Sequence, residues 1–284
     1  MGKLSKKQRA AERLQENIAV LRCPICHEDV TLKDQQNIIC PNRHVFDLAK
    51  QGYLNMAKQS QSTIYDTSLF SARQRLNDAG FYQPLVNQLD QELADLAPKT
   101  VLDAGCGEGS HLQQLNKRRQ IPFPVGIDLA KEGIRQAAKH DEDVQWIVAD
   151  LANIPMDNQS VDVLLNILSP SNYAEFERVL ADDGVVIKVV PNQGYLKELR
   201  QQLDQTDYSN NDVVDRFRES FDIIRKQRVV AQQHLSEAMF QDLIQMTPLT
   251  QDADLNQLSY TQHVTLDLTV LVGQKKLKIK KSLR

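Results

Sequence analysis

The sequence predicts an α/β protein in which a small metal-binding module precedes a doubly wound, mostly parallel sheet. Three observations support this prediction. Short apolar segments alternate with helical patterns between residues 100 and 190. A glycine cluster at residues 105–109 directly follows one of the apolar segments. Three of the four cysteines fall within the first 40 residues, which is typical of a metal site in a reducing compartment.

Length and composition are those of an ordinary globular protein. The chain has 284 residues, of which 41% are hydrophobic and 25% are charged, enough for one large domain and a small module. It contains no run of about 18 apolar residues, and it does not open with a signal-peptide pattern. We therefore expect a cytoplasmic protein that does not enter a membrane.

Charge is distributed unevenly along the chain. The net charge is −3, yet residues 1–22 carry six basic and two acidic side chains, and residues 273–284 carry six basic and no acidic ones. Basic ends on an acidic body suggest that the ends contact a polyanion. Solvated tails without a partner fit the same pattern equally well.

The cysteines at the N-terminus have the spacing of a closed zinc site. Cys23 and Cys26 form a C-x-x-C pair, and after thirteen residues Cys40 and His44 form a C-x-x-x-H pair. Four such ligands complete a tetrahedral zinc site with no open position. About 22 residues are too few for a hydrophobic core, so we expect the metal to supply the folding energy. A redox C-x-x-C motif is the alternative, but it lacks a thioredoxin-like context.

Helical patterns flank this site. Apolar residues recur at helical spacing within residues 6–21. Residues 71–94 read as two helices interrupted near Gly80 and Pro84. We therefore divide the chain into four parts: a basic helical extension at 1–20, a zinc-binding module at 21–62, a large α/β domain at 63–272 and a basic tail at 273–284.

The sheet is predicted from five apolar segments, each ended by an acid or a proline. The expected strands are residues 101–103, 123–128, 144–150, 161–168 and 184–190, with helices at 110–117, 130–139 and 173–180. Two later segments, 229–234 and 264–272, alternate like an antiparallel pair around a helix at 237–246. Ligands of such sheets bind beyond the carboxyl ends of the strands, where these acids fall.

The glycine cluster predicts a ligand that carries positive charge and hydroxyl groups. Its spacing is G-x-G-x-G, not that of a dinucleotide fingerprint, and Glu108 stands where a phosphate-binding loop has a basic residue. Asp103 precedes the glycines. Asp128 ends the next strand about 20 residues later, where such folds bind ribose hydroxyls. Asp150 ends the strand after that.

This loop resembles the motif of class I S-adenosylmethionine (SAM) methyltransferases. The resemblance implies SAM as the cofactor and places Asp150 and Leu151 beside its adenine. With Asp103, Gly105, Gly107, Glu108 and Asp128, these residues form the predicted cofactor site. A glycine turn in some other α/β fold is the alternative.

The combination with the cysteine module resembles the RlmA family (also called RrmA, with TlrB a relative). The shared motifs are CPIC at 23–26, ICPNRHVFD at 39–47, AKQGYLN at 49–55, DAGFYQPL at 78–85, LDAGCGEG at 102–109 and QMTP at 245–248. The family methylates N1 of a guanine in large-subunit ribosomal RNA. The resemblance implies zinc on the four ligands named above and SAM contacts from Tyr82, Gly107, Glu108 and Asp128. Where the family has a histidine near SAM, this chain has Tyr195.

We therefore expect a SAM-dependent 23S rRNA (guanine-N1)-methyltransferase that acts on a hairpin loop near the peptide exit tunnel, with a homodimer plausible for the family. The zinc module would hold the RNA through phosphate contacts from Lys33, Arg43, Lys50 and Lys58. The target base must leave its stack. The group that accepts the N1 proton stays open among Asp150, Asn166 with Ser169, and His111.

Two other functions compete with this one. A methyltransferase acting on a small molecule, such as an antibiotic or a quinone, would share the cofactor site, but the zinc module and basic ends favour RNA. A non-catalytic zinc RNA-binding protein with a relic methyltransferase fold is the second alternative. The intact set of glycines and acids between Asp103 and Asp128 argues against it.

Overall fold

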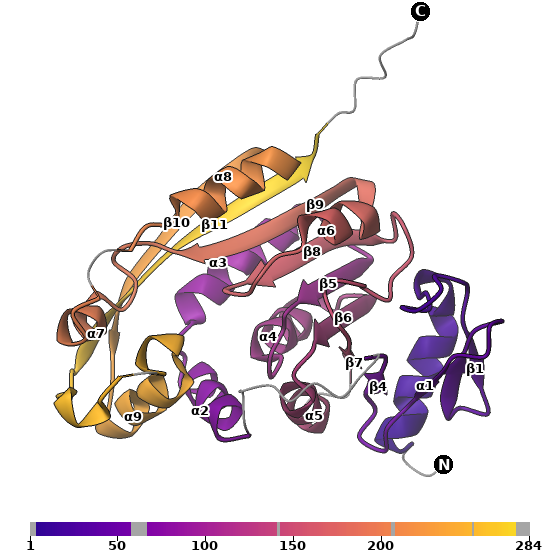
Figure 1. Cartoon of the computed structure of the whole chain (residues 1–284), viewed down its shortest axis with the longest axis horizontal. Helices are drawn as coiled ribbons and strands as arrows, with labels where there is room; N and C mark the ends of the chain where they lie inside the picture. Colours follow the sequence, from indigo (N-terminus) through magenta and orange to yellow (C-terminus); the bar gives the residue numbers. More distant parts are fainter. Residues whose placement is uncertain (1–3, 58–66, 141–142, 206–207, 252, 277–284) are drawn as a thin grey trace, which may run out of the picture.

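The computed structural model describes residues 4–57, 67–140, 143–205, 208–251 and 253–276. Its centre is an eight-stranded sheet with the strand order β10-β11-β9-β8-β5-β6-β7-β4 (Figure 1). The five predicted strands are present and mutually parallel: β5 (Thr100–Ala104), β6 (Phe123–Asp128), β7 (Gln145–Val148), β8 (Val161–Ile167) and β9 (Leu180–Pro191). The predicted fold class is therefore confirmed.

Helices cover both faces of the sheet, as the alternation of strands and helices in a doubly wound fold predicts. One face packs against α2 (Thr67–Asp78), α3 (Gln83–Ala94), α4 (Ser110–Arg119), α5 (Lys131–His140) and α9 (Glu237–Met246). The other face packs against α1 (Lys6–Glu16), α6 (Tyr173–Val179) and α8 (Asn211–Ser220). A further short helix, α7 (Lys197–Gln202), follows β9. None of the helices in the described ranges has the length and apolar character that crossing a bilayer requires.

The strand order places a cleft above β5. From β5 the chain proceeds outward to β6 and β7, and then returns across β5 to β8 and β9. The loops that leave β5 and β8 therefore turn in opposite directions, and a ligand site forms between them at the carboxyl edge. This topology positions the glycine cluster, which follows β5, opposite the loop that follows β8.

The N-terminal part is joined to the edge of this sheet. Three short strands, β1 (Thr31–Lys33), β2 (Asn37–Ile39) and β3 (Val45–Asp47), form a separate antiparallel sheet. The next strand, β4 (Leu54–Asn55), pairs in parallel with β7. Figure 1 shows this part and α1 beside the β7 edge. The N-terminal segments are therefore continuous with the core of the main sheet.

The first helix is shorter than its apolar pattern suggested, but it is firmly packed. Ser5 and Gln8 form a capping box at its start. The helix ends at Glu16, and a 3₁₀ turn (Ile18–Val20) follows. The Lys6 ammonium donates to carbonyl oxygens in the last turn of α5, where the helix dipole favours a cation.

The C-terminal strands are longer than predicted. β10 (Phe221–His234) and β11 (His263–Lys275) pair antiparallel over almost their whole length, and β11 also pairs with β9. Alternation is lost directly before residues 229–234, because Lys226, Gln227 and Arg228 are all exposed, and a register shift lies further back between Ile223 and Arg225. β11 extends into the segment assigned to the basic tail, and residues 277–284 lie outside the described ranges.

Candidate active site and zinc centre

The four predicted zinc ligands converge. The ligand atoms of Cys23, Cys26, Cys40 and His44 all lie within 4.8 Å of one another. The Cys26 and Cys40 Sγ atoms are 3.6 Å apart, and His44 Nδ1 lies 3.3 Å from Cys40 Sγ and 3.5 Å from Cys23 Sγ. Ligands at Zn–S distances of about 2.3 Å in a tetrahedron are roughly 3.8 Å apart. The cluster therefore fits zinc, and its nitrogen ligand is Nδ1.

Hydrogen bonds join the zinc module to the segment that follows β7. The amide of Arg22 donates to the carbonyl of Pro155, and the amide of Asp157 donates to the carbonyl of Val20. The Arg22 guanidinium donates to the Asp157 carboxylate at 2.7 Å. The same segment begins at Asp150, which was predicted to lie beside the cofactor's adenine. One stretch of chain therefore contacts both the zinc module and the cofactor site.

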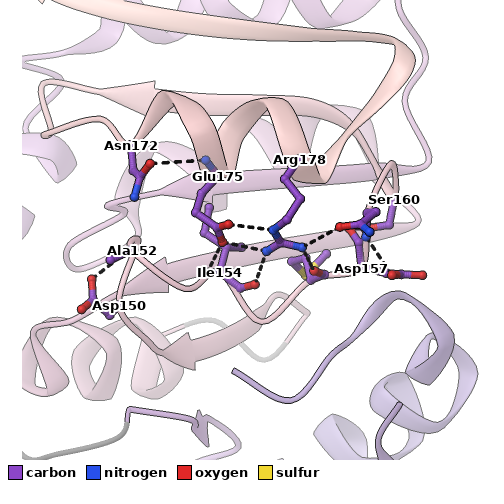
Figure 2. A network of polar contacts seen from close by, with 10 residues as sticks. Asp150, Ala152, Ile154, Asp157, Ser160, Asn172, Glu175 and Arg178 are labelled. Carbon is purple, nitrogen blue, oxygen red and sulfur yellow. Dashed lines mark hydrogen bonds and ion pairs between the residues drawn. The ribbon is translucent and has the colours of Figure 1, made fainter. Parts of the chain in front are cut away.

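Arg178 of α6 holds this stretch in place (Figure 2). Its guanidinium donates to both carboxylate oxygens of Glu175 and to the carbonyl oxygens of Ile154 and Met156, at 2.7–2.8 Å. The Glu175 carboxylate in turn accepts from the amide of Ile154. Only a planar guanidinium with several donors satisfies these acceptors at once.

Replacing Arg178 with lysine is expected to lower the free energy of unfolding by about 2 kcal/mol, because a lysine leaves buried carbonyl oxygens without donors. Urea unfolding monitored by circular dichroism measures the change. Arg218→Lys is the matched control: Arg218 pairs with Asp215 one helical turn away, and both side chains are more than half exposed. That control should change stability by less than about 0.5 kcal/mol. Equal effects of the two substitutions would contradict the assignment.

A cavity of about 660 Å³ lies at the carboxyl edge of the sheet. Most of the residues predicted to bind the cofactor line it: Tyr82, Asp103, Gly105, Glu108, Asp128, Asp150, Leu151 and Tyr195. Gly107 is not among the lining residues, but its amide donates to the Asp128 carboxylate at 2.8 Å. The structure therefore brings the predicted residues together around one cavity.

The glycine loop requires glycine where it crosses the sheet edge. Gly105 has φ +84°, and a Cβ atom there would lie 1.9 Å from Ser169 Oγ in the loop after β8. Asp128 fixes the other side of the loop. One of its carboxylate oxygens accepts from the amide of Gly107, and the other accepts from the amide of Ala130, which holds the carboxylate in place. The backbone of residues 105–107 is thus fixed beside the cavity by the carboxylate of Asp128 and by the close approach of Ser169.

Buried carboxyl groups give the cavity a strong preference for a cation. Burial, with smaller contributions from the neighbouring Asp128 and Glu108, raises the pKa of Asp103 to about 8. Burial also raises the pKa of Glu108. Asp103 Oδ1 and Glu108 Oε2 make no hydrogen bond within the described residues. A ligand with an ammonium and a sulfonium group, such as SAM, would satisfy these atoms and would favour their charged forms.

Two polar residues of α2 were missed by the sequence analysis. Arg73 lines the cavity, and its Nε lies 3.9 Å from Glu108 Oε2. Asn77 Nδ2 donates to Glu108 Oε1 at 3.3 Å. The two residues are four positions apart and therefore share a face of α2. Asn77 is buried, and a polar residue on the apolar face of a predicted helix was the available signal.

Tyr82 and Tyr195 form a buried pair in the lining of the cavity. Their hydroxyl groups are 2.8 Å apart and share a hydrogen bond. The ring of His111 packs edge-on against Tyr82, and its Nε2 atom makes no hydrogen bond within the described residues. Burial, with a smaller contribution from Arg73, lowers the pKa of His111 to about 4. The histidine is therefore neutral at physiological pH.

The loop that follows β8 is tied together by Asn166. Its amide nitrogen donates to the carbonyls of Ala104 and Pro170, and its Oδ1 accepts from Lys188 and from the Ser171 hydroxyl. Lys188 of β9 also lines the cavity and was missed by the sequence analysis. Of the candidate proton-transfer residues in this region, Ser169 lines the cavity, whereas Asn166 is buried behind the lining and does not reach it.

A second, basic cavity of about 810 Å³ lies beyond α7. Lys197 and Arg200 of α7 and Lys226 and Arg228 of β10 line it, and Arg200 lines the first cavity as well. Arg200 is buried, its Nε donates to the carbonyl of Tyr195, and its guanidinium stacks on the ring of Tyr208. These cations connect the first cavity to a surface suited to phosphate groups.

The chain matches two known protein families over parts of its length, and it is similar to two curated proteins over about nine-tenths of its length. The N-terminal domain of RlmA matches residues 21–60, and a methyltransferase domain matches residues 101–184. The chain is 38% identical over 279 residues to YxjB of Bacillus subtilis (strain 168), named as a 23S rRNA (guanine-N(1)-)-methyltransferase; the match covers 91% of this chain and 98% of YxjB. It is 28% identical over 271 residues to the 23S rRNA (guanine(748)-N(1))-methyltransferase of Streptomyces fradiae, covering 90% and 96% of the two chains.

Proposed function

Because the chain belongs to the RlmA family, we propose that it transfers a methyl group from SAM to N1 of a guanine in a hairpin loop of 23S rRNA, near the peptide exit tunnel. The observation that carries this proposal is one chain that joins a Cys₃His zinc centre to a cation-binding methyltransferase cavity. A small-molecule methyltransferase would need only the second of these.

The residues around the cavity suit each part of SAM. We assign the ribose hydroxyls to Asp128 and the adenine to the segment at Asp150 and Leu151. We assign the positive charge of SAM to Asp103 Oδ1 and Glu108 Oε2, which make no hydrogen bond within the described residues. We assign the methionine carboxylate to Arg73, which lines the cavity beside Glu108. Bound SAM supplies an electrophilic methyl group, so the protein chiefly has to position the two reactants and exclude water.

Two basic regions are assigned to RNA. The zinc module (residues 21–62) offers Lys33, Arg43 and Lys50, while Lys58 lies outside the described residues. The cavity beyond α7 offers Lys197, Arg200 and Lys226, while Arg228 is paired with the carboxylate of Asp267 in the same cavity. Phosphate contacts of this kind fix the register of an RNA without reading its sequence. The target guanine is then splayed out of its stack to reach the catalytic domain (residues 63–272). Action on ribosomal RNA corresponds to a cytoplasmic protein, and a homodimer stays a prediction.

Methylation of deproteinised 23S rRNA with labelled SAM, followed by mapping of the modified base, tests the proposal. We expect label at N1 of one guanine in the exit-tunnel hairpin, and no label when that guanine is replaced by adenine. SAM binding is measured in parallel by calorimetry. A protein that binds SAM but labels neither deproteinised 23S rRNA nor precursor ribosomal particles would contradict the proposal and favour a small-molecule substrate.

A further inference from the structure

A lysine amine is buried at the target side of the cavity. Lys188 lies in β9, directly opposite Asn166 of β8 in the parallel register. Its side chain is only 4% exposed, although it lines the cavity. Nζ donates to Asn166 Oδ1 at 2.5 Å and to the carbonyl oxygen of Ser169 at 2.6 Å. A cation this deeply buried usually has a carboxylate partner, and no ion pair of Lys188 is found within the described residues.

The hydrogen bonds to Asn166 and Ser169 occupy two of the three tetrahedral positions around Lys188 Nζ that its side-chain carbon leaves free, so one position remains. Both partners are oxygen acceptors, so two N–H groups satisfy them. A neutral amine has two N–H groups and one lone pair, whereas an ammonium ion has three N–H groups. The network is therefore complete with the amine in its neutral form. The third tetrahedral position on Nζ can then hold a lone pair or a proton without breaking a contact to Asn166 or Ser169.

Burial favours the neutral form of this amine. It lowers the pKa of Lys188 to about 8, and burial is its only cause. The other titratable groups that line the same cavity come from every element around it: Arg73 of α2, Tyr82 before α3, Asp103 of β5, Cys106 and Glu108 of the glycine loop, His111 of α4, Asp128 of β6, Asp150 after β7, and Tyr195 and Arg200 near α7. On α6, Tyr173 is hydrogen-bonded to Ser171, which itself donates to Asn166. None of these groups contributes to the shift of the Lys188 pKa.

Methylation at N1 of guanine requires a proton acceptor. The N1 lone pair is delocalised into the ring carbonyl, so N1 becomes a good nucleophile only as its proton leaves. The acids of the cavity lie around the glycine loop, where they are assigned to the cofactor. His111 is a weak base, because its pKa is lowered to about 4. Lys188 lies on the opposite side, beside the loop after β8.

We propose that Lys188 Nζ accepts the N1 proton of the target guanine as the methyl group is transferred. The N1–H bond breaks toward the Nζ lone pair, and the electron pair left on N1 forms the new bond to the methyl carbon. The carbon–sulfur bond breaks, and its electron pair stays on sulfur. The resulting ammonium ion loses its proton to water after the product leaves. This role rests on the proposed guanine-N1 activity.

Asn166 and Ser169 position the amine in this scheme. The Asn166 amide is held by Ala104 at the end of β5 and by Pro170, so its Oδ1 has a fixed direction. The lysine is therefore fixed relative to the glycine loop through a single side chain. This explains why a charged residue interrupts the apolar sequence of β9 at the point where that strand reaches the cavity.

Lys188→Arg and Lys188→Met test the proposal. Arginine can keep the donated hydrogen bonds but cannot accept a proton at ordinary pH. We expect both variants to bind SAM with wild-type affinity and to lower the single-turnover methylation rate at pH 7.5 at least 100-fold, within the range typical of a lost general base. The wild-type rate should rise with pH and level off near pH 8. In Lys188→Arg that plateau should disappear, and the rate should keep rising up to about pH 9.5.

Lys117→Arg on the exposed last turn of α4 is the matched control and should keep the wild-type rate and pH profile. A Lys188→Arg variant that retains the wild-type rate, or the same plateau near pH 8 at a reduced rate, would overturn the proposal and leave Lys188 a structural role. Wild-type protein that binds SAM but methylates no ribosomal RNA would instead contradict the proposed function, so the two failures are distinguishable.

Discussion

Replacing Cys40 with serine is expected to abolish zinc binding and RNA methylation while leaving SAM binding intact. Structural zinc contributes about 10–16 kcal/mol of apparent binding free energy in small modules, which is more than a short three-stranded sheet can replace. The strands β1, β2 and β3 have three residues each and gain their order from the cluster of Cys23, Cys26, Cys40 and His44. We therefore expect residues 21–47 to lose their structure.

The main sheet should survive this loss. Helix α1 buries Ala10, Ala11 and Leu14 against the large domain, and β4 pairs with β7 through backbone hydrogen bonds. Zinc content, hydrogen exchange across residues 21–57 and calorimetric SAM binding measure the three effects separately. His27→Asn is the control: this exposed histidine follows Cys26 but lies outside the ligand set, and asparagine tolerates its φ of +61°. A zinc-free Cys40→Ser protein that methylates RNA at the wild-type rate would contradict the assignment.

The sequence predicted the features that depend on neighbouring residues. Parallel strands buried on both faces produce continuous apolar segments, so β5 to β9 were visible without any knowledge of their partners. The zinc ligands lie in two short motifs whose spacing alone defines the site. Acids at strand ends were predictable for the same reason, because parallel strands end at a common edge.

Contacts between distant segments were not visible in this way. β4 has two residues and therefore no periodicity, and its pairing with β7 depends on the docking of the whole N-terminal part. Arg73 approaches Glu108 only because α2 lies over the glycine loop. The hydroxyl contact between Tyr82 and Tyr195 joins residues 113 positions apart. For Tyr82, only the family resemblance indicated a role.

Lys188 differs from these residues, because its position in the sequence alone marks it as unusual. It stands between Ile187 and Val189 in a strand predicted to be buried on both faces. A charged residue at such a position is rarely fully buried without a specific partner or function. The sequence could have identified Lys188 as exceptional, but not Asn166 as its partner, because that pairing requires the register of β8 and β9.

Replacing Asp128 with alanine is expected to weaken SAM binding at least 100-fold. One carboxylate oxygen accepts from the amide of Gly107 and the other from the amide of Ala130, so the side chain both shapes the glycine loop and faces the cavity. Hydrogen bonds to a charged group contribute about 1.5–3 kcal/mol each. Loss of the ribose contacts alone then costs about 3 kcal/mol, which corresponds to a factor of roughly 100.

The control for this substitution separates binding from loop stability. Asp162 likewise accepts two backbone bonds, from the amides of Lys99 and Thr100 at 2.8 Å each, but it lies at the opposite edge of the sheet and does not line the cavity. Asp162→Ala should therefore lower the thermal stability as Asp128→Ala does, yet leave SAM affinity within about twofold of the wild type. Calorimetric titration with SAM measures the affinity of both variants. Unchanged SAM affinity in Asp128→Ala would contradict the assignment of Asp128 to the ribose. An equal loss of SAM affinity in Asp162→Ala would show that the loss in Asp128→Ala comes from reduced stability of the protein. Because the two carboxylates differ mainly in which edge of the sheet they occupy, the comparison measures what the carboxyl edge contributes to cofactor binding.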